Sequence, residues 1–504
     1  MALWTRVRRT LSRPAVGVGL AVSLVVLLRA PYAGGLAYPD EGGLLLVAQQ
    51  WREGGPQLYG RLFVDRPPGL MAFFVVGDTL GGLEAVRWLG IGVIAVLVLV
   101  AGRIGWLVGG RVAAVWTALA AAALACNPLL GTRAVNAELV GAPLTLLCCL
   151  AAITAVRREG AARRVLLVAA GVLASCALLV KQNLVDGLVF GAVLVAMLAL
   201  TRAWSARRSL AAAGWAAAGA VGPWLLTVGW VVVDGPGLRV LWESLYGFRT
   251  AASAVIAGQD ASAPARRLIT LPFLALASGL LLILGIGCWR LRRRLRGRDP
   301  VVVATLAMTV AELAGVMLGG SYWAHYLLGL LPGAVLLMAL LVNGPRGRLR
   351  VVIATAGVAV ASTVVTSAVA VIPHTPADRG DEVALVGWLR EAGRPRDTGV
   401  VTWGHPQLLE ATGLRPRSPL IWSLPQRTFD PRLDRFVQML AGRRAPTWVL
   451  VWDPVDSWDL DEGGRAKTTL TAHYRFISSL CDIGVFVRRD IYRVLPPLPT
   501  RCVD

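Results

Sequence analysis

Long apolar runs dominate the first 372 residues of the chain, separated by short connections rich in arginine or in acidic residues. A helix of about 20 apolar residues crosses a hydrocarbon core of about 30 Å. Hydrophobic residues make up 56% of the chain and charged residues only 16%, which is too apolar for a soluble core. The pattern predicts a polytopic all-α membrane protein with about 11 transmembrane helices, near residues 15–30, 85–102, 112–130, 139–156, 165–180, 184–201, 209–233, 269–289, 300–318, 327–342 and 351–372.

The connections between these spans alternate in charge. Cytoplasmic connections usually carry the excess of lysine and arginine. If the N-terminus is cytoplasmic, every second connection is basic, and together these hold 22 arginines with Glu159 and Asp299 as their only acids. We therefore expect an uncleaved first span and a multi-pass protein of the cytoplasmic membrane. The first loop, 31–84, and everything after the last span then lie on the outer face.

Residues 373–504 follow a different pattern, with short apolar runs bounded by proline, glycine and aspartate. The runs "TGVVTWG", "TWVLVW", "GVFVRR" and "IYRVL" are typical of strands, whereas "EVALVGWLREAG", "PRLDRFVQMLAGR" and "RAKTTLTAHYRFISSL" have helical spacing. The chain thus divides into a transmembrane domain, 1–372, and a small α/β C-terminal extracytoplasmic domain, 373–504.

The net charge of +21 does not indicate nucleic-acid binding, because the arginines lie in clusters between apolar runs rather than in a stripe with aromatic residues. The sequence also contains no CxxC pair, HExxH motif, phosphate-binding loop or GxGxxG after a strand. A metal hydrolase of those types and a nucleotide-driven pump would therefore lack their minimal motifs.

Acidic residues gather in the first outer loop, in "YPDEGGLLLVAQQWREGG". Asp40 and Glu41 could simply cap a helix over 41–53, which has an amphipathic pattern and is expected at the membrane surface. Asp65 precedes "RPPG", and Glu138 lies at the outer end of a span in "GTRAVNAELVGAP". The predicted topology places all these carboxylates at one interface, where they could line a cavity.

The segment "YPDEGGLLLVAQQWREGGPQLYGRLFVDRPPGLMAFF" resembles the first outer loop of the C-type (GT-C) glycosyltransferases that use polyprenyl-phosphate sugars. It is most similar to the protein mannosyltransferase and lipid A aminoarabinose transferase group. The segments "LLVKQN", "SYWAHYLLGLLPGAVLLMAL" and "VVTWGHPQLLEATGLRPRSPLIW" resemble other parts of the same family. The resemblance extends over most of the chain, with its most specific motif in the first loop.

This resemblance implies transfer of a sugar from a polyprenyl-phosphate donor to a glycan, lipid or protein acceptor at the outer face of the membrane, with inversion. Asp40 would be the base, and Glu41 and Glu138 further catalytic carboxylates. Stabilisation of the leaving phosphate is expected from one or more of five cationic candidates, Arg66, Arg133, Lys181, Arg249 and His325. A divalent metal is a candidate cofactor, with Asp65 as its candidate ligand.

Each candidate has a structural alternative. Arg66 and Lys181 could extend to the lipid head groups, and His325 could belong to an interfacial aromatic belt. Glu138 could form a cap or an ion pair with Arg133. Glu312 lies inside a predicted span, where an ionisable residue normally faces a cavity or a partner, and no family motif covers it.

Two other classes of function share these features. A transporter or flippase of lipid-linked sugars would also be polytopic with buried charges, although the sequence has no evident internal repeat. A non-catalytic membrane scaffold is the third class. The sugar, the acceptor and a metal requirement are left open by the sequence.

Cys481 and Cys502 are the only cysteines of the C-terminal domain. In an oxidising compartment we expect them to form a disulfide. The intervening "GVFVRRDIYRVL" predicts a hairpin with its turn at Arg489–Asp490, which would bring the two cysteines together.

Overall fold

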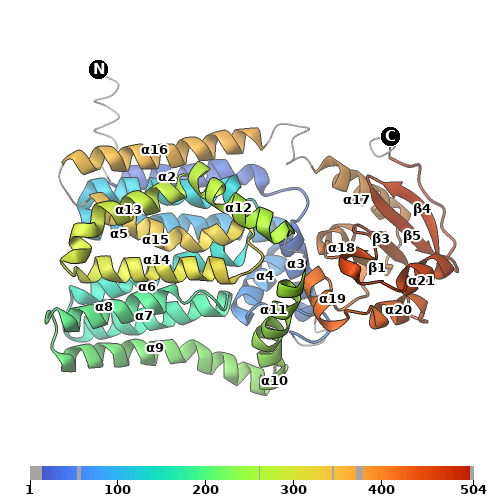
Figure 1. Cartoon of the computed structure of the whole chain (residues 1–504), viewed down its shortest axis with the longest axis horizontal. Helices are drawn as coiled ribbons and strands as arrows, with labels where there is room; N and C mark the ends of the chain where they lie inside the picture. Colours follow the sequence, from blue (N-terminus) through green and yellow to red (C-terminus); the bar gives the residue numbers. More distant parts are fainter. Residues whose placement is uncertain (1–13, 54–57, 260–261, 343–345, 371–378, 500–504) are drawn as a thin grey trace.

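The computed structural model describes residues 14–53, 58–259, 262–342, 346–370 and 379–499. Figure 1 shows a bundle of roughly parallel and antiparallel helices beside a smaller domain that contains a sheet. The helices of the bundle are α2 (Pro14–Arg29), α5 (Leu83–Cys126), α6 (Ala137–Val156), α7 (Gly160–Val180), α8 (Asp186–Leu200), α9 (Ala206–Val233), α12 (Ser262–Ala277), α13 (Leu280–Arg296), α14 (Pro300–Leu318), α15 (Leu331–Val342) and α16 (Arg346–Val369).

Four further helices lie in the two long connections at the end of the bundle that faces the smaller domain (Figure 1). The loop after α2 contains α3 (Pro39–Arg52) and α4 (Pro68–Leu80), and the loop after α9 contains α10 (Leu238–Trp242) and α11 (Phe248–Gly258). The helix begins at Pro39, two residues before the predicted range 41–53, so Asp40 and Glu41 lie in its first turn. Its setting differs from the prediction, because eight consecutive residues, 41–48, are buried. The helix is thus enclosed by protein rather than lying with one polar face on the membrane surface.

The long helix α5 is a hairpin of two legs. Gly110 interrupts it with φ 79° and ψ −165°. A Cβ atom at Gly105 would lie 2.6 Å from the carbonyl oxygen of Ala113, whereas eight residues of straight helix would separate the two by about 12 Å. The legs therefore run back along one another and correspond to the predicted spans 85–102 and 112–130.

Within the described residues, eight helices are long and apolar enough to cross a membrane, or nine if α12 and α13 form one bent span. The predicted number of about 11 is higher for identifiable reasons: α5 counts once although it holds two legs, and α8 has only 15 residues. The continuous span predicted at 269–289 is wrong. The chain bends by 74° between α12 and α13, where Gly279 adopts φ 82°.

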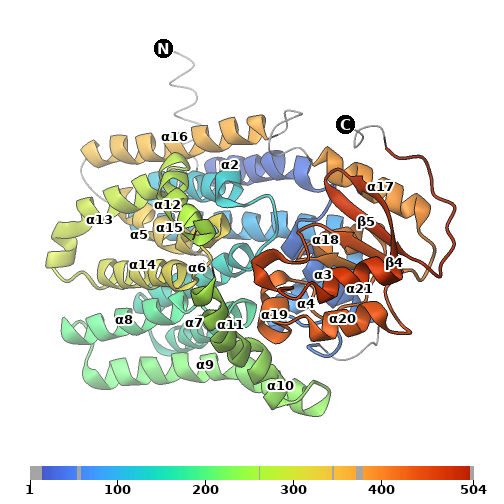
Figure 2. The same ribbon diagram turned by 45° about the vertical axis from the view of Figure 1, so that its right-hand side comes forward.

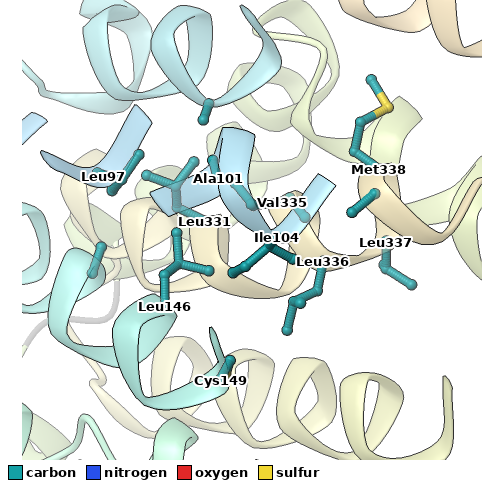
Figure 3. Packing of buried hydrophobic residues seen from close by; sticks show 14 of the residues in the cluster. Leu97, Ala101, Ile104, Leu146, Cys149, Leu331, Val335, Leu336, Leu337 and Met338 are labelled. Carbon is teal, nitrogen blue, oxygen red and sulfur yellow. The ribbon is translucent and has the colours of Figure 1, made fainter. Parts of the chain in front are cut away.

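The core of the bundle lies where α5, α6 and α15 meet (Figure 3). Leu97 and Ile104 of α5, Leu146 of α6, and Leu336 and Leu337 of α15 are all fully buried. Alanines fill much of the second leg of α5, and small side chains let helices approach closely in a membrane. The fold class is confirmed as an all-α multi-pass membrane protein with a small α/β domain.

The C-terminal domain has a five-stranded mixed sheet in the order β2-β1-β3-β5-β4. The strands β1, β2 and β3 are parallel, whereas β5 is antiparallel to both of its neighbours. Helices surround the sheet, as seen from another side in Figure 2. The elements are α17 (Gly380–Ala392), β1 (Thr398–Thr402), α18 (Pro406–Thr412), β2 (Arg415–Pro416), α19 (Ser423–Phe429), α20 (Asp434–Ala441), β3 (Trp448–Val451), α21 (Arg465–His473), β4 (Tyr474–Leu480) and β5 (Ile483–Arg488).

Two predictions for the end of the chain are wrong. The run "RAKTTLTAHYRFISSL" is not one helix, because α21 ends at His473 and the chain continues as β4. The hairpin turn is not at Arg489–Asp490 but at Cys481–Asp482, whose φ values of 49° and 64° suit a tight turn between antiparallel strands. The run "IYRVL" forms no strand in this part of the described chain.

Cys481 is disulfide-bonded, and it lies in the turn between β4 and β5. Its predicted partner, Cys502, lies outside the described residues, so the pairing stays a prediction. The reason given for it does not hold, since no hairpin connects the two positions. The other five cysteines are free.

Candidate active site

Glu41 is the structural centre of the first loop. Its side chain is 0% exposed, and its two carboxylate oxygens accept hydrogen bonds from Arg87 Nη2 at 2.8 Å and from the Val135 amide at 2.7 Å. It also accepts a bond of 3.1 Å from the Tyr38 amide, which closes the first turn of α3. Three segments far apart in the sequence are thereby joined at one carboxylate.

Arg87 completes this arrangement from the start of α5. Besides Glu41, it donates to the carbonyl oxygens of Gly34 at 2.6 Å and Leu36 at 2.9 Å. A buried charge is tolerated when it is paired and hydrogen-bonded, and both conditions hold here. The pair fixes the path of the chain from α2 into α3, and so the position of Asp40.

Asp40, the next residue toward the N-terminus, lies in a different environment. It is half-buried, and within the described residues its carboxylate has no hydrogen bond or ion pair. It is close enough to Arg66, His325 and Tyr326 to interact with each of them electrostatically. An unpaired carboxylate, as judged from the described residues, therefore lies near cationic and hydrogen-bonding groups.

Asp65 gathers two arginines beside this site. Arg66 Nη1 lies 2.6 Å from Asp65 Oδ1, and Arg249 of α11 pairs with the other oxygen. Burial would raise the pKa of Asp65, but the two guanidinium groups outweigh it and hold that pKa below its ordinary value. Burial likewise opposes the charge on Arg66, but Asp65 and Asp40 outweigh it and raise the pKa of Arg66.

Two hydrogen bonds hold the backbone of Asp65 and Arg66. Tyr59 donates from its hydroxyl to the carbonyl oxygen of Arg66 at 2.8 Å. Gln182, which follows Lys181 after α7, donates to the carbonyl oxygen of Asp65 at 2.8 Å. These bonds fix the segment before α4, so the two charged side chains start from a rigid backbone.

A second ion pair, between Glu138 and Lys181, lies in the same region. Lys181 ends α7, and its ammonium lies over the ring of Tyr326, 4.8 Å from the centroid. His325 packs edge-on against the same ring at 5.0 Å. Glu138 is thus neither a simple cap nor the partner of Arg133, the two structural alternatives that its sequence context allowed.

The C-terminal domain packs directly on α3. A Cβ atom at Gly42 would lie 2.5 Å from the Cα of Gln407 in α18, and one at Gly43 would lie 2.3 Å from the ring of Trp422. Only residues without a side chain permit this approach. The smaller domain therefore covers the helix that carries Asp40.

No protein-family model matches the chain, and no curated protein is significantly similar to it in sequence. Solved structures do match. ArnT from Cupriavidus metallidurans, bound to undecaprenyl phosphate, superposes with a TM-score of 0.62 at 16% identity, covering 94% of this chain and 97% of that one. ArnT is a lipid A aminoarabinose transferase.

The archaeal oligosaccharyltransferase AglB from Archaeoglobus fulgidus, in complex with an inhibitory peptide and a dolichol-phosphate, has a TM-score of 0.51 at 14% identity. This match covers 96% of this chain and 76% of that one. An Archaeoglobus fulgidus oligosaccharyltransferase with zinc and sulfate has a TM-score of 0.50 at 14% identity, with coverages of 86% and 67%. The chain has the GT-C glycosyltransferase fold. The fold expected from the first-loop resemblance is confirmed.

The GT-C fold brings most of the predicted site residues together. Glu138, Lys181 and His325 interact electrostatically with one another, and Arg66 interacts with Asp40, Asp65 and Glu138. Arg133 is the exception among the cationic candidates. Its carbonyl oxygen accepts from Arg29 at 3.4 Å, and its charge acts on Tyr32, so it lies near the end of α2.

Sequence reasoning missed several residues of this site. Arg87 sits inside a predicted span, and the cost of a charge there is a signal that could have drawn attention to it, as it did for Glu312. Tyr59 and Gln182 gave no such signal, because polar residues in loops are common. Tyr326 is next to the candidate His325 in the sequence, but its contact with Lys181 forms only in the folded chain.

The residues at Asp65 do not fit a divalent metal. Both of its oxygens are engaged by guanidinium groups, whose charge repels a cation. Across the described ranges, no group of three or more His, Cys, Asp or Glu side chains could hold a metal ion. The candidate ligand Asp65 is better described as the acid that assembles Arg66 and Arg249.

Proposed function

We propose that this protein transfers a sugar from a polyprenyl-phosphate donor to an acceptor hydroxyl, with Asp40 as the general base. One observation carries the proposal: a half-buried carboxylate, unpartnered among the described residues, lies within electrostatic reach of a cluster of cations at the end of a membrane bundle. A base on one side and cations for a leaving phosphate on the other are the two requirements of the reaction. The GT-C fold of the chain supports the same conclusion.

In the proposed reaction, Asp40 accepts the proton of the acceptor hydroxyl as its oxygen attacks the anomeric carbon of the donor sugar. The bond between that carbon and the phosphate oxygen breaks, and the electron pair leaves with the lipid monophosphate. A single displacement inverts the configuration of the anomeric carbon. No nucleotide takes part, in keeping with a sequence that contains no phosphate-binding loop of the nucleotide type.

Arg66 and Arg249 are the proposed binding groups for the leaving phosphate, with Lys181 and His325 beside them. A guanidinium has five N–H donors, and the bonds to Asp65 use only some of them. The remaining donors can meet phosphate oxygens as negative charge develops. Glu138 and Glu41 are proposed to position these groups: Glu138 holds Lys181, and Glu41 holds the start of α3.

An apolar groove supports a lipid-linked donor. A cavity of about 920 Å³ lies between α4, α5 and α6, with Phe73, Trp88, Val140 and Leu147 among its walls. Val140 lies in α6, the helix whose first turn carries Glu138. From Glu84 to Val96 the groove follows α5 for about 18 Å, long enough for several isoprene units of a polyprenyl chain.

We further propose that the site and the domain after residue 373 face the outside of the cell membrane. The arginine-rich connections α8–α9 and α13–α14 lie at the opposite end of the bundle (Figure 1), where the positive-inside rule would place the cytoplasm. In a Cys288→Ser background, Arg444→Cys should react with an impermeant thiol reagent in intact cells, and Arg298→Cys should not. The reverse labelling would overturn the orientation.

The test of function uses the purified full-length protein in bilayers and a panel of polyprenyl-phosphate sugars. We expect one of these donors to release free polyprenyl phosphate, with the sugar recovered on an acceptor. A transporter would instead move the lipid-linked sugar across the bilayer with its glycosyl bond intact. No cleavage with any donor, together with movement of one of them, would replace the proposal with the transporter.

A further inference from the structure

A second cavity, of about 490 Å³, lies between the first loop and the C-terminal domain. Arg61 and Leu62 form one wall, the 416–420 segment after β2 forms another, and Asp430 and Arg435 lie on the far side. Neither the sequence motifs nor the proposed reaction assigns a role to these residues. The walls of this cavity are more polar than those of the groove beside α5, although apolar side chains such as Leu62, Leu420 and Met439 also line it.

Three arginines line the cavity, and two of them, Arg61 and Arg435, are exposed to solvent. Within the described residues, the side chains of Arg61, Arg417 and Arg435 form no ion pair. Arg417 is half-buried, and its Nε is fully buried without a hydrogen-bond partner. Leaving the buried Nε of Arg417 unpaired costs free energy, and an anion in the cavity would offset that cost and be attracted by the two exposed arginines as well.

The single acidic residue in the walls does not neutralise these arginines. Asp430 is 5% exposed, and it accepts from the amides of Arg435 at 3.1 Å and Phe436 at 3.0 Å. It also accepts from Gln426 Nε2 at 3.1 Å. Its carboxylate thus holds the start of α20 in place, while the guanidinium groups stay available to the cavity.

The cavity is connected to the candidate active site by short, fixed segments. The Phe63 amide donates to the carbonyl oxygen of Pro419 at 2.9 Å, which ties the first loop to the cavity wall. The Phe63 ring packs on Phe248 at 4.8 Å, and the next residue, Arg249, pairs with Asp65. Arg61 lies only four positions before Asp65, at most about 14 Å of extended chain.

We propose that this cavity binds an anionic group, a phosphate or a carboxylate, carried by the acceptor. The inference rests on the proposed function, because it makes Arg61, Arg417 and Arg435 the anchor that presents an acceptor hydroxyl toward Asp40. Guanidinium groups match both anions through paired N–H donors. The acceptor class is therefore a negatively charged glycan or lipid rather than a neutral sugar.

The test measures binding of inorganic phosphate, glucuronate and glucose to the full-length protein in phosphatidylcholine nanodiscs by calorimetry. The double variant Arg417→Gln with Arg435→Gln is compared with the control Arg444→Gln with Arg475→Gln, which removes two exposed arginines of the same domain outside the cavity. We expect both anions to bind the native protein and the control. Their affinity should fall by about tenfold or more in the cavity variant, and glucose should not bind the cavity.

Phosphatidylglycerol nanodiscs distinguish the two sources of the anion. If a lipid head group enters the cavity, phosphate will bind more weakly in phosphatidylglycerol nanodiscs than in phosphatidylcholine nanodiscs. This difference will be seen only when Arg417 and Arg435 are present. If the anion belongs to a soluble glycan, lipid composition will not matter. Unfolding temperatures of both double variants, measured alongside, ensure that a loss of binding is not a loss of fold.

Equal phosphate affinity in the two double variants, or no binding of either anion by the native protein, would overturn the inference. Neither result depends on a donor. Anion binding that is lost in the cavity variant, with no cleavage of any polyprenyl-phosphate sugar, would leave the site standing and remove the proposed function. Donor cleavage, together with anion binding that is unaltered in the cavity variant, would support the proposed function and remove the anion site.

Discussion

Asp40 and Glu41 are neighbours in the sequence but lie in opposite environments. Glu41 is fully buried, and its carboxylate is satisfied by Arg87 and by two backbone amides. Asp40 is half-buried and has no hydrogen bond within the described part of the chain. The comparison separates two uses of a carboxylate at the start of one helix: one holds the fold, and the other is left open for chemistry.

The same contrast applies to the wider site. Asp65 and Glu138 are paired with arginine and lysine, as Glu41 is with Arg87, but one of these partners, Arg66, also interacts electrostatically with Asp40. Acids of this kind position cations without reacting themselves. Each prediction below tests whether a polar group belongs to the framework or to the reacting site.

The largest expected effect on stability follows loss of the Glu41 carboxylate. Glu41→Ala leaves Arg87 buried without its partner, which costs about 3–5 kcal/mol. We expect a lower unfolding temperature or loss of folded protein in detergent, whereas Glu53→Ala, with its side chain 69% exposed, should behave like the native chain. Equal unfolding temperatures for the two variants would place Glu41 outside the framework.

If Glu41→Ala yields no folded protein, Glu41→Leu combined with Arg87→Met keeps the test available. This pair removes both charges, and replacing a buried ion pair by apolar residues is often nearly neutral. The double variant should therefore be more stable than Glu41→Ala alone.

A pH-dependent effect is expected where the C-terminal domain meets α3. His405, just before α18, stacks on Trp452 at 3.8 Å, and burial lowers its pKa to about 4. Unfolded chains bind this proton near pH 6.5, so the folded state should lose stability as the pH falls from 6.5 toward 4, by up to about 3 kcal/mol. Urea unfolding of the native protein and of His405→Phe, measured between pH 6.5 and pH 4, tests this loss of stability.

The His405→Phe variant keeps a ring against Trp452 but cannot titrate. It should lose less stability than the native protein over the same pH range. Parallel pH profiles for the two proteins would show that another group is responsible.

Gly42→Ala should separate the C-terminal domain from α3. The added methyl would lie 2.5 Å from the Cα of Gln407, which belongs to a helix backbone and cannot simply rotate away. Overpacking of this kind costs about 1–3 kcal/mol. Limited proteolysis should cut more readily between the bundle and the domain, while Gly191→Ala in α8, with open space around its Cβ, should leave the digestion unchanged.

The smallest effect is expected at Glu312, a buried acid inside α14. Its Oε1 accepts from the Gly333 amide at 2.9 Å, and its Oε2 has no hydrogen-bond partner among the described residues. Glu312→Gln keeps the acceptor and leaves no cation unpaired, so unfolding should shift by less than about 1 kcal/mol. A loss as large as that of Glu41→Ala would reveal a partner that the Glu312 carboxylate requires.

The end of the bundle that holds the site could be predicted from the sequence, because alternating basic connections assign each loop to one side. The pairings within the site could not. Glu41 meets Arg87 across 46 residues and Val135 across 94, and Glu138 meets Lys181 across 43. Composition and spacing carry no information about such distant contacts, so Glu41 was grouped with Asp40 as catalytic.

In the C-terminal domain, too, the sequence was sufficient to predict some elements but not others. Short apolar runs were sufficient to place β1, β3 and β5. The apolar residues of segment 474–480 also fit a helical spacing and therefore predict a helix, but the segment pairs with β5 as a strand. A hydrophobic count likewise could not reveal the sharp bend between α12 and α13, which depends on one glycine.

The central claim is that Asp40 is the base of a sugar transfer. Asp40→Asn keeps the size and polarity of the side chain but cannot accept a proton, so transfer from the active polyprenyl-phosphate sugar should fall by about 10²–10⁴-fold. Donor binding and the unfolding temperature should be unchanged, since no framework bond is lost. Initial rates of lipid phosphate release by the purified variant and the native protein, measured side by side with saturating donor, provide the test. A variant that retains most of the native rate would contradict the account.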